Sequence, residues 1–373
     1  MTSTQTFMSA AAAVLALVCG GPVAAQIVIG QTTGFSGPIA AGAKENTDGA
    51  RLYFDHVNRR GGVNGQRIEL VSLDDKFQPK LAVENARKLI NDHRVLALFL
   101  NRGTPHTEAI RPLLGEYKIA LVGPSSGAMS LHFPVSPWIF NVRAPYQLEA
   151  VRAVKHLTSI GMNRIAVASV DDAFGADCVI GARKGFDEAG IEPVSMLRFD
   201  RDKPDFSAIA QASVKTNAQA VLFIGSSGAV ADGTRALRAQ GSQAQIVTLS
   251  NNASRGFVQQ MGPNARGTIV AQVFPRERSL SAPIVKEAHD LAVAKGMKEV
   301  TPAMLEGYAA AKVLVEGLRK AGPHPTRQGL RDALEGLQRL DIGGLELSFS
   351  ASSHTGLTYS DLAIIGPQGT FLR

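Results

Sequence analysis

The sequence predicts an α/β protein in which parallel sheets are covered by helices on both faces and divided between two lobes. Short apolar segments alternate with longer ones whose apolar residues recur every three or four positions, as in strands connected by helices. This alternation runs through two successive parts of the chain, with a break near Pro145. A chain of 373 residues is also longer than one hydrophobic core usually serves.

The first part of the pattern starts with an apolar strand at 27–29, followed by a glycine-rich turn at 33–38. Apolar positions between Ala43 and Val57 are spaced to share one helix face, and a Gly-Gly pair ends that helix. The remaining predicted elements of this part are a strand at 68–73, a helix that opens at Pro79, a strand at 95–100, a helix at 108–117 and a strand at 119–122.

The second part repeats the alternation and ends in a loop-rich tail. Its predicted helices cover 147–159, 176–189, 206–215, 229–240, 282–295 and 302–320, and its predicted strands cover 165–170, 193–199, 220–224, 246–249, 345–349 and 362–365. The two parts resemble two similar lobes rather than a repeat array of short period.

The N-terminus has the pattern of a secretory leader. Residues 10–18 form an apolar run too short to span a bilayer, and Val23 and Ala25 fit the small-residue positions before a cleavage site. We therefore expect residues 1–25 to be a signal peptide that is cleaved after Ala25 in an exported chain. Cys19 is a less suitable alternative as a lipid attachment site, because the residue before it is Val18 rather than a small residue.

Composition excludes several classes of protein. The formal net charge is +7, but the basic residues are scattered without a dense run or interleaved aromatics, so no nucleic-acid partner is expected. Cys178 is the only cysteine after the leader, which leaves no intrachain disulfide and no cysteine-based zinc site, and we expect it to be a small buried residue in a helix. No motif for a metal or cofactor is complete, so none is expected.

One motif allows an enzymatic alternative. Residues 123–127 read Gly-Pro-Ser-Ser-Gly, which matches the G-x-S-x-G turn that presents a hydrolase serine, and Asp341 and His354 follow in suitable chain order. Such a turn needs a helix directly after the serine, whereas 128–137 contains two prolines and no helical period. A secreted serine hydrolase using Ser125 is therefore kept as an alternative to a ligand-binding loop.

Small polar residues follow several of the predicted strands at their carboxyl ends. Ligands of open α/β sheets bind at those ends, and hydroxyls and free backbone N–H groups at helix starts suit a carboxylate. Because the loops come from both lobes, we expect a site between the lobes. The loops are 32–38, 101–105, 123–127, 171–175, 225–228 and 250–254.

The chain after the leader resembles, nearly end to end, the periplasmic substrate-binding proteins of branched-chain-amino-acid-type ABC transporters. The stretches that carry the resemblance are Thr33-Gly-Phe-Ser-Gly-Pro38, Val57-Asn-Arg-Arg-Gly-Gly-Val-Asn-Gly65, Leu73-Asp-Asp75, Phe140-Asn-Val-Arg143, Asp172-Ala-Phe-Gly175, Asp205-Phe-Ser207 and Gly307-Tyr-Ala-Ala310.

The resemblance implies a type I periplasmic binding protein fold, with two Rossmann-like lobes joined by a three-crossover hinge. It places crossovers near Ala144, Phe274 and Leu345, so that lobe 1 covers 26–144 and 275–344 and lobe 2 covers 145–274 and 345–373. It also implies a periplasmic monomer without catalytic activity, which captures a small molecule by hinge closure and delivers it to a membrane ABC permease and its ATPase. A periplasmic ligand sensor of the same fold is the alternative.

The same resemblance implies where the ligand binds. The matching positions are Thr104, Ser125, Ser126 and Gly127 in lobe 1, and Phe174, Ser226, Ser227, Ser250 and Asn251 in lobe 2. Thr104 falls on the hydroxyl that binds a carboxylate, and Phe174 on the aromatic of the first lobe-2 loop.

Two positions depart from the family pattern. Ser250 and Asn251 stand where an acidic residue usually takes the ligand's ammonium group, and Gly42 stands where an aromatic is often found. Arg102 can add a charge-assisted hydrogen bond to a carboxylate. We therefore expect an aromatic or other non-amino carboxylate as the ligand, with an amino acid as the alternative.

Overall fold

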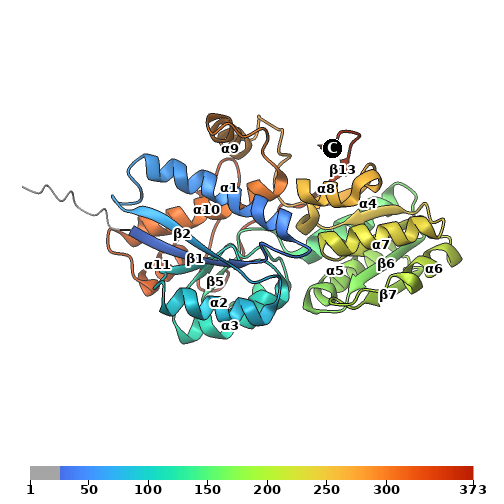
Figure 1. Ribbon diagram of the computed structural model, residues 1–373, viewed down its shortest axis with the longest axis horizontal. Coiled ribbons are helices and arrows are strands. Elements are labelled where there is room, and N and C mark those ends of the chain that lie inside the picture. Colours follow the sequence, from blue (N-terminus) through green and yellow to red (C-terminus); the bar gives the residue numbers. More distant parts are fainter. Residues whose placement is uncertain (1–25, 373) are drawn as a thin grey trace, which may run out of the picture.

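The computed structural model describes residues 26–372 and arranges them as two α/β lobes side by side (Figure 1). Each lobe has its own central sheet, with helices on both faces. The predicted signal peptide, 1–25, lies outside the described residues. Within 26–372 no helix is both long enough and apolar enough to cross a membrane.

Lobe 1 is built on a five-stranded parallel sheet in the order β2-β1-β3-β4-β5. Neighbouring residues of a strand point to opposite faces, so Leu98 packs into one buried cluster and Phe99 into the other. Helices α1, α9, α10 and α11 cover the Phe99 face, and α2 and α3 cover the Leu98 face. The strands are β1 (Gln26–Thr33), β2 (Arg67–Asp74), β3 (Ala97–Phe99), β4 (Leu121–Val122) and β5 (Ile139–Phe140), and the helices are α1 (Ala40–Arg59), α2 (Pro79–Asn91), α3 (Thr104–Glu116), η1 (Met129–Leu131), α9 (Pro283–Ala294), α10 (Pro302–Ala321) and α11 (Arg327–Glu335).

Lobe 2 has a seven-stranded sheet in the order β14-β13-β10-β9-β8-β6-β7, in which only β13 and β14 run antiparallel to their neighbours. Helices α4 and α5 cover one face, where Cys178 is fully buried as predicted, and α6, α7 and α8 cover the other. The strands are β6 (Ile165–Val170), β7 (Ser195–Phe199), β8 (Ala220–Ile224), β9 (Gln245–Thr248), β10 (Ile269–Gln272), β13 (Asp361–Ile365) and β14 (Phe371–Leu372), and the helices are α4 (Tyr146–Ser159), α5 (Ala173–Ala189), α6 (Ser207–Lys215), α7 (Ser227–Ala239), η2 (Ser250–Asn252), α8 (Arg255–Met261) and η3 (Gly262–Asn264).

The two lobes repeat one strand order, because β7-β6-β8-β9-β10 corresponds to β2-β1-β3-β4-β5. The predicted fold class, two Rossmann-like lobes with parallel-sheet cores, is therefore confirmed. The fifth strand of each lobe, β5 and β10, was not predicted, because each is short and lacks a period of its own. In this strand order the loops after β1 and β3, and after β6 and β8, leave a crevice at the carboxyl ends of the strands.

The predicted third crossover at Leu345 is wrong. Leu347, Phe349 and Leu357 are buried in the core of lobe 1, and the Phe349 ring packs edge-on against Phe140 with centroids 5.4 Å apart. The apolar segment that resembled a strand of lobe 2 instead pairs locally, as β12 (Glu346–Leu347) with β11 (Leu340–Asp341). Only β13 and β14 return to the second sheet, and the boundaries at 144 and 274 stay predictions.

Candidate functional site

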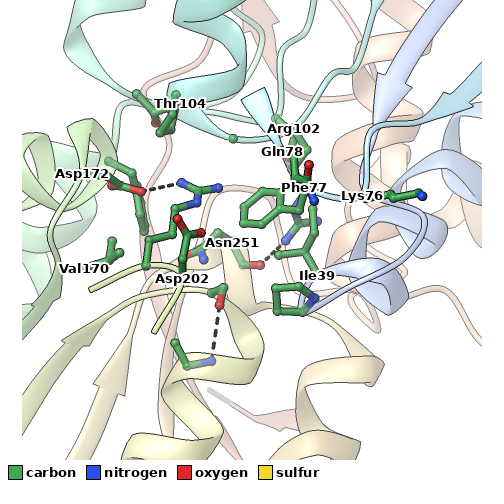
Figure 2. Close-up of a pocket in the computed structure, with 18 of the residues that line it drawn as sticks. Ile39, Lys76, Phe77, Gln78, Arg102, Thr104, Val170, Asp172, Asp202 and Asn251 are labelled. Carbon is green, nitrogen blue, oxygen red and sulfur yellow. Dashed lines mark hydrogen bonds and ion pairs between the residues drawn. The ribbon is translucent and has the colours of Figure 1, made fainter. Parts of the chain in front are cut away.

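A cavity of about 280 Å³ lies between the carboxyl ends of the two parallel sheets (Figure 2). Loops after β1, β2, β3 and β4 supply the lobe 1 wall, and loops after β6, β7, β8 and β9 supply the lobe 2 wall. This is the interlobe position that the polar loops predicted. The cavity is lined by Pro38, Ile39, Lys76, Phe77, Gln78, Arg102, Gly103, Thr104, Pro105, Ser125, Tyr146, Val170, Asp172, Phe174, Phe199, Arg201, Asp202, Ser226, Ala229 and Asn251.

Arg102 is the buried charged group of the lobe 1 wall. Its side chain follows β3, only 6% of the residue is exposed, and its Nη2 donates to the backbone oxygen of Asn251 across the cleft. Among residues 26–372 it has no carboxylate in ion-pair distance. Burial lowers the pKa of Arg102, because enclosing a charge is costly, and the nearby carboxylates of Glu306 and Glu45 offset only part of that cost. Gly42 makes room for this guanidinium, since a Cβ there would lie 3.1 Å from Arg102 Nη1.

Hydroxyl groups stand beside Arg102. Thr104 is the first residue of α3, and its Oγ1 lies 2.8 Å from Ser126 Oγ, which fixes its rotamer. Ser125 lines the cavity and accepts a 3.1 Å hydrogen bond from the side-chain amide of Asn46. Ser126 lies behind Thr104 and does not reach the cavity. Gly127 does not line it either, because its carbonyl accepts the Tyr146 N–H at 2.7 Å.

The lobe 2 loops divide in the same way between wall and support. Phe174, Ser226 and Asn251 line the cavity, whereas Ser227 and Ser250 point into the lobe. Ser227 donates to Asn252 Oδ1 at 2.9 Å. Thus, of the ten residues predicted for the site, the cavity brings together Arg102, Thr104, Ser125, Phe174, Ser226 and Asn251.

A buried ion pair lies beneath the cavity. Arg143 contacts the Glu149 carboxylate, and both groups bind Ser250. Burial opposes the charge on Arg143, but neighbouring acidic groups outweigh it and raise its pKa. The guanidinium also lies 4.2 Å from the centroid of the Tyr146 ring, which lines the cavity. Ser250 therefore supports the site from behind rather than facing a ligand.

Four prominent lining residues were not named for the site from the sequence, namely Phe77, Tyr146, Asp172 and Arg201. Asp172 lies in the predicted loop 171–175, and it caps α5 by accepting the Gly175 N–H at 3.0 Å. Its other oxygen pairs with Arg201 Nη1 at 2.5 Å, so both oxygens are occupied. Phe77 and Arg201 each lie a few residues after the carboxyl end of a strand. That position was used to select the polar loops, and it would also have identified these two residues if the selection had not been restricted to small residues.

The charges of the lining favour a single anion. Lys76, Arg102 and Arg201 are basic and Asp172 and Asp202 are acidic, which leaves one positive charge in excess. Because Arg201 and Asp172 neutralise each other, the excess is concentrated on Arg102 and the exposed Lys76.

The hydrolase constellation does not assemble. Ser125 is followed by a loop and the three-residue turn η1, not by the helix that a nucleophile turn needs. His354 Nδ1 lies 2.9 Å from the Ile139 carbonyl, and its Nε2 lies 3.1 Å from Glu335, so neither nitrogen is directed at the serine. Asp341 is exposed and accepts backbone N–H groups of its own turn. The interpretation of Ser125 as a nucleophile is wrong.

Comparisons with known proteins agree with this geometry. The chain matches the periplasmic binding protein family model over residues 26–366. It is 25% identical over 337 residues to a Leu/Ile/Val-binding protein of Rhizobium johnstonii, which covers 89% of each chain. The crystal structure of a substrate-binding periplasmic protein from Ralstonia solanacearum matches with 31% identity and a TM-score of 0.85, over 93% of this chain and 99% of that one. A fatty acid ABC transporter substrate-binding protein from Thermomonospora curvata shares the fold, with 22% identity and a TM-score of 0.82 over 93% of this chain and 90% of that one.

Proposed function

The chain belongs to the periplasmic binding protein family, and we propose that it captures a small carboxylate without an α-ammonium group and delivers it to an ABC permease and its ATPase. The family assignment makes the chain a periplasmic solute-binding protein of the ABC transporter type, and not an enzyme. The ligand class is our proposal, and it rests on the chemistry of the cavity.

The single observation that carries the proposal is Arg102. A guanidinium that is buried at a ligand cavity with no carboxylate in ion-pair distance among residues 26–372 is stabilised when a ligand supplies the anion. Thr104 and Ser125 place hydroxyls on the same wall, and α3 begins there with N–H groups of its first turn. Together these donors suit the two oxygens of a carboxylate.

The lobe 2 wall offers an ammonium group no free enclosed carboxylate among residues 26–372, and Asn251 Oδ1, which is enclosed without a hydrogen-bond partner there, is a neutral acceptor. Asn251, at the position where an acidic residue was expected, carries no charge, and its amide nitrogen donates to the Gly225 carbonyl at 2.9 Å. Both oxygens of Asp172 are occupied, and Asp202 is exposed at the rim. An α-amino acid would therefore bury its positive charge with weak compensation.

Aromatic and aliphatic side chains form the rest of the cavity lining. Phe174 packs edge-on against Tyr146 with centroids 4.9 Å apart, so the two rings form one apolar wall. Ile39, Phe77 and Phe199 add apolar surface. A planar ring can pack against such walls, which favours an aromatic acid over a small hydrophilic one.

Calorimetry on the purified protein without its leader tests the ligand class. We expect benzoate or phenylacetate to bind more tightly than leucine, isoleucine or valine. Arg102→Met should weaken the binding of the carboxylate by about tenfold to a hundredfold, the usual range for a lost charged hydrogen bond. Arg51→Met, at an exposed arginine of the same lobe, is the matched control and should leave affinity unchanged.

The amino-acid alternative is favoured by the names of the curated relatives, which include a Leu/Ile/Val-binding protein. Tight leucine binding without a response to either aromatic acid would establish that alternative and refute ours. Uptake of the labelled ligand in a strain that lacks the gene separates transport from sensing, because a sensor would leave uptake unchanged.

Export, hinge closure and a monomeric state complete the proposal. Mass spectrometry of the secreted protein should give a chain that begins at Gln26, and a lipid-bearing chain that begins at Cys19 would contradict it. Because a ligand in the cavity contacts both lobes, it favours the closed form. Small-angle scattering should therefore show a monomer that becomes more compact at saturation.

A further inference from the structure

We propose that Phe77 and Arg201, which come from opposite lobes, form a clamp that holds the cleft closed over the ligand. The Arg201 guanidinium carbon lies 4.4 Å from the centroid of the Phe77 ring, within the range of a cation–π contact. Both side chains line the cavity, Phe77 after β2 and Arg201 after β7. The inference rests on the proposed function only in assuming that the two lobes close around a small molecule.

The backbone of lobe 1 is strained where it presents Phe77. Lys76 and Phe77 both have left-handed conformations, with φ of 52° and 58°, which side chains other than glycine adopt at a cost. The carboxylates of Asp74 and Asp75 hold this turn by accepting the Lys76 N–H at 2.8 Å and the Phe77 N–H at 2.9 Å. Such strain persists only where the surroundings enforce it, and it is concentrated at functional positions.

A buried histidine supports the ring from behind. His106 is fully buried and stacks on Phe77 with centroids 4.5 Å apart and planes 17° from parallel. Arg201 lies over the same ring, so Phe77 contacts an imidazole of its own lobe and a guanidinium of the other. The lobe 1 half of the clamp is therefore supported by contacts within lobe 1.

The lobe 2 half is held by Asp172. Its carboxylate pairs with Arg201 Nη1 at 2.5 Å and is itself fixed as the cap of α5, and the dashed line at Asp172 in Figure 2 marks this pair. The pair is neutral overall, so the clamp does not compete with Arg102 for the ligand's negative charge. Arg201 Nη2 is enclosed without a hydrogen-bond partner among residues 26–372, and the contact of this guanidinium with Phe77 joins the two lobes.

The arrangement predicts that affinity depends on the clamp through closure. Phe77→Leu keeps the wall apolar but removes the aromatic face, and Arg201→Met removes the cation. Each should weaken ligand binding by about fivefold to thirtyfold, mainly through faster dissociation, because an open cleft releases the ligand. The double variant should be little weaker than Arg201→Met alone, since that change already removes the contact with Phe77 together with the Asp172 pair.

The test measures compaction by small-angle scattering, with benzoate and leucine titrated separately into each variant. Whichever ligand compacts the wild type, we expect the three variants to require correspondingly more of it for half-compaction. Arg198→Met is the matched control, because Arg198 pairs with Asp171 at 3.0 Å in the same region but is 62% exposed in its side chain. Half-compaction at the wild-type concentration in Phe77→Leu or Arg201→Met, or losses that simply add in the double variant, would overturn the clamp.

A ligand-free measurement separates the clamp from the ligand proposal. In the full chain without its leader, the variant Phe77→Cys with Arg201→Cys should be joined by a short bismaleimide, and the joined protein should scatter as the compact form. Cys178 is buried and stays unmodified. If neither benzoate nor leucine compacts the wild type, the ligand proposal fails. Efficient cross-linking would still support the clamp in that case. Failure to cross-link refutes the clamp, whatever the ligand is.

Discussion

Two buried histidines should make this protein less stable in mild acid. His106 and His132 are both enclosed, and burial lowers their pKa values from 6.5 to about 3 and about 4, with smaller contributions from Arg201 and Arg143 respectively. The folded protein keeps both imidazoles neutral, whereas the unfolded chain takes up protons near pH 6.5. Their contribution to stability is therefore fully present above pH 6.5 and is lost as the pH falls toward the folded pKa values.

The magnitude follows from the size of the shifts. For each histidine, the free energy of unfolding falls by about 1.4 kcal/mol per pH unit below 6.5. The two histidines together therefore lower it by about 4 kcal/mol at pH 5. Asp75 opposes this loss. Burial raises its pKa from 3.8 to about 6, so its contribution is present at low pH and lost as the pH rises through about 6. Between pH 7 and pH 5, Asp75 raises the free energy of unfolding by about 1–2 kcal/mol. The net loss from these three groups is therefore about 2–3 kcal/mol.

Urea unfolding at pH 7, 6 and 5 measures the effect. His106→Leu removes one titrating group, so the loss of unfolding free energy between pH 7 and pH 5 should shrink by about 2 kcal/mol relative to the wild type, whatever the variant's stability at pH 7. Ile110→Val, which changes a buried side chain of the same helix that does not titrate, should leave the pH dependence unchanged. An identical pH dependence in His106→Leu and the wild type would refute the reasoning, because His106 would then be protonated in the folded protein.

Three further substitutions test the packing around the cleft. Asp75→Asn should raise the unfolding free energy by about 2–3 kcal/mol at pH 7, because it removes the buried charge of a carboxyl group whose pKa is about 6. It should have little effect near pH 4, and urea titrations at both pH values measure the difference. Glu149→Ala should lower the unfolding free energy by about 3–5 kcal/mol by leaving Arg143 as an unpaired buried charge; unchanged thermal unfolding would contradict the ion pair. Gly307→Ala should lower the unfolding free energy by about 1–3 kcal/mol or more, because the added Cβ would lie 1.8 Å from a backbone oxygen of α1. Gly115→Ala is the control and should be neutral or stabilising, because the space around Gly115 is open.

The sequence was sufficient for the architecture and for the location of the site. Apolar periods identify strands and helices locally, and a chain that alternates them forms parallel sheets whose carboxyl ends face a crevice. That reasoning places the loops 101–105, 123–127, 171–175, 225–228 and 250–254 at the cavity, and the family resemblance then selected Thr104, Ser125, Phe174, Ser226 and Asn251 within them. It does not locate short strands such as β5, nor does it assign the segment around Phe349 to lobe 1, because a brief apolar segment carries no information about which core it joins.

Tertiary structure decided which neighbour in each loop faces the cavity. Consecutive side chains of a loop point in different directions, and hydrogen bonds to other parts of the fold hold some of them away from the cavity. Ser126 hydrogen-bonds to Thr104, and Ser250 donates to Glu149. The pairing of Phe77 with Arg201 is of the same kind. The two residues lie in different lobes and share no local pattern, so their contact exists only because the folded lobes bring two strand ends together.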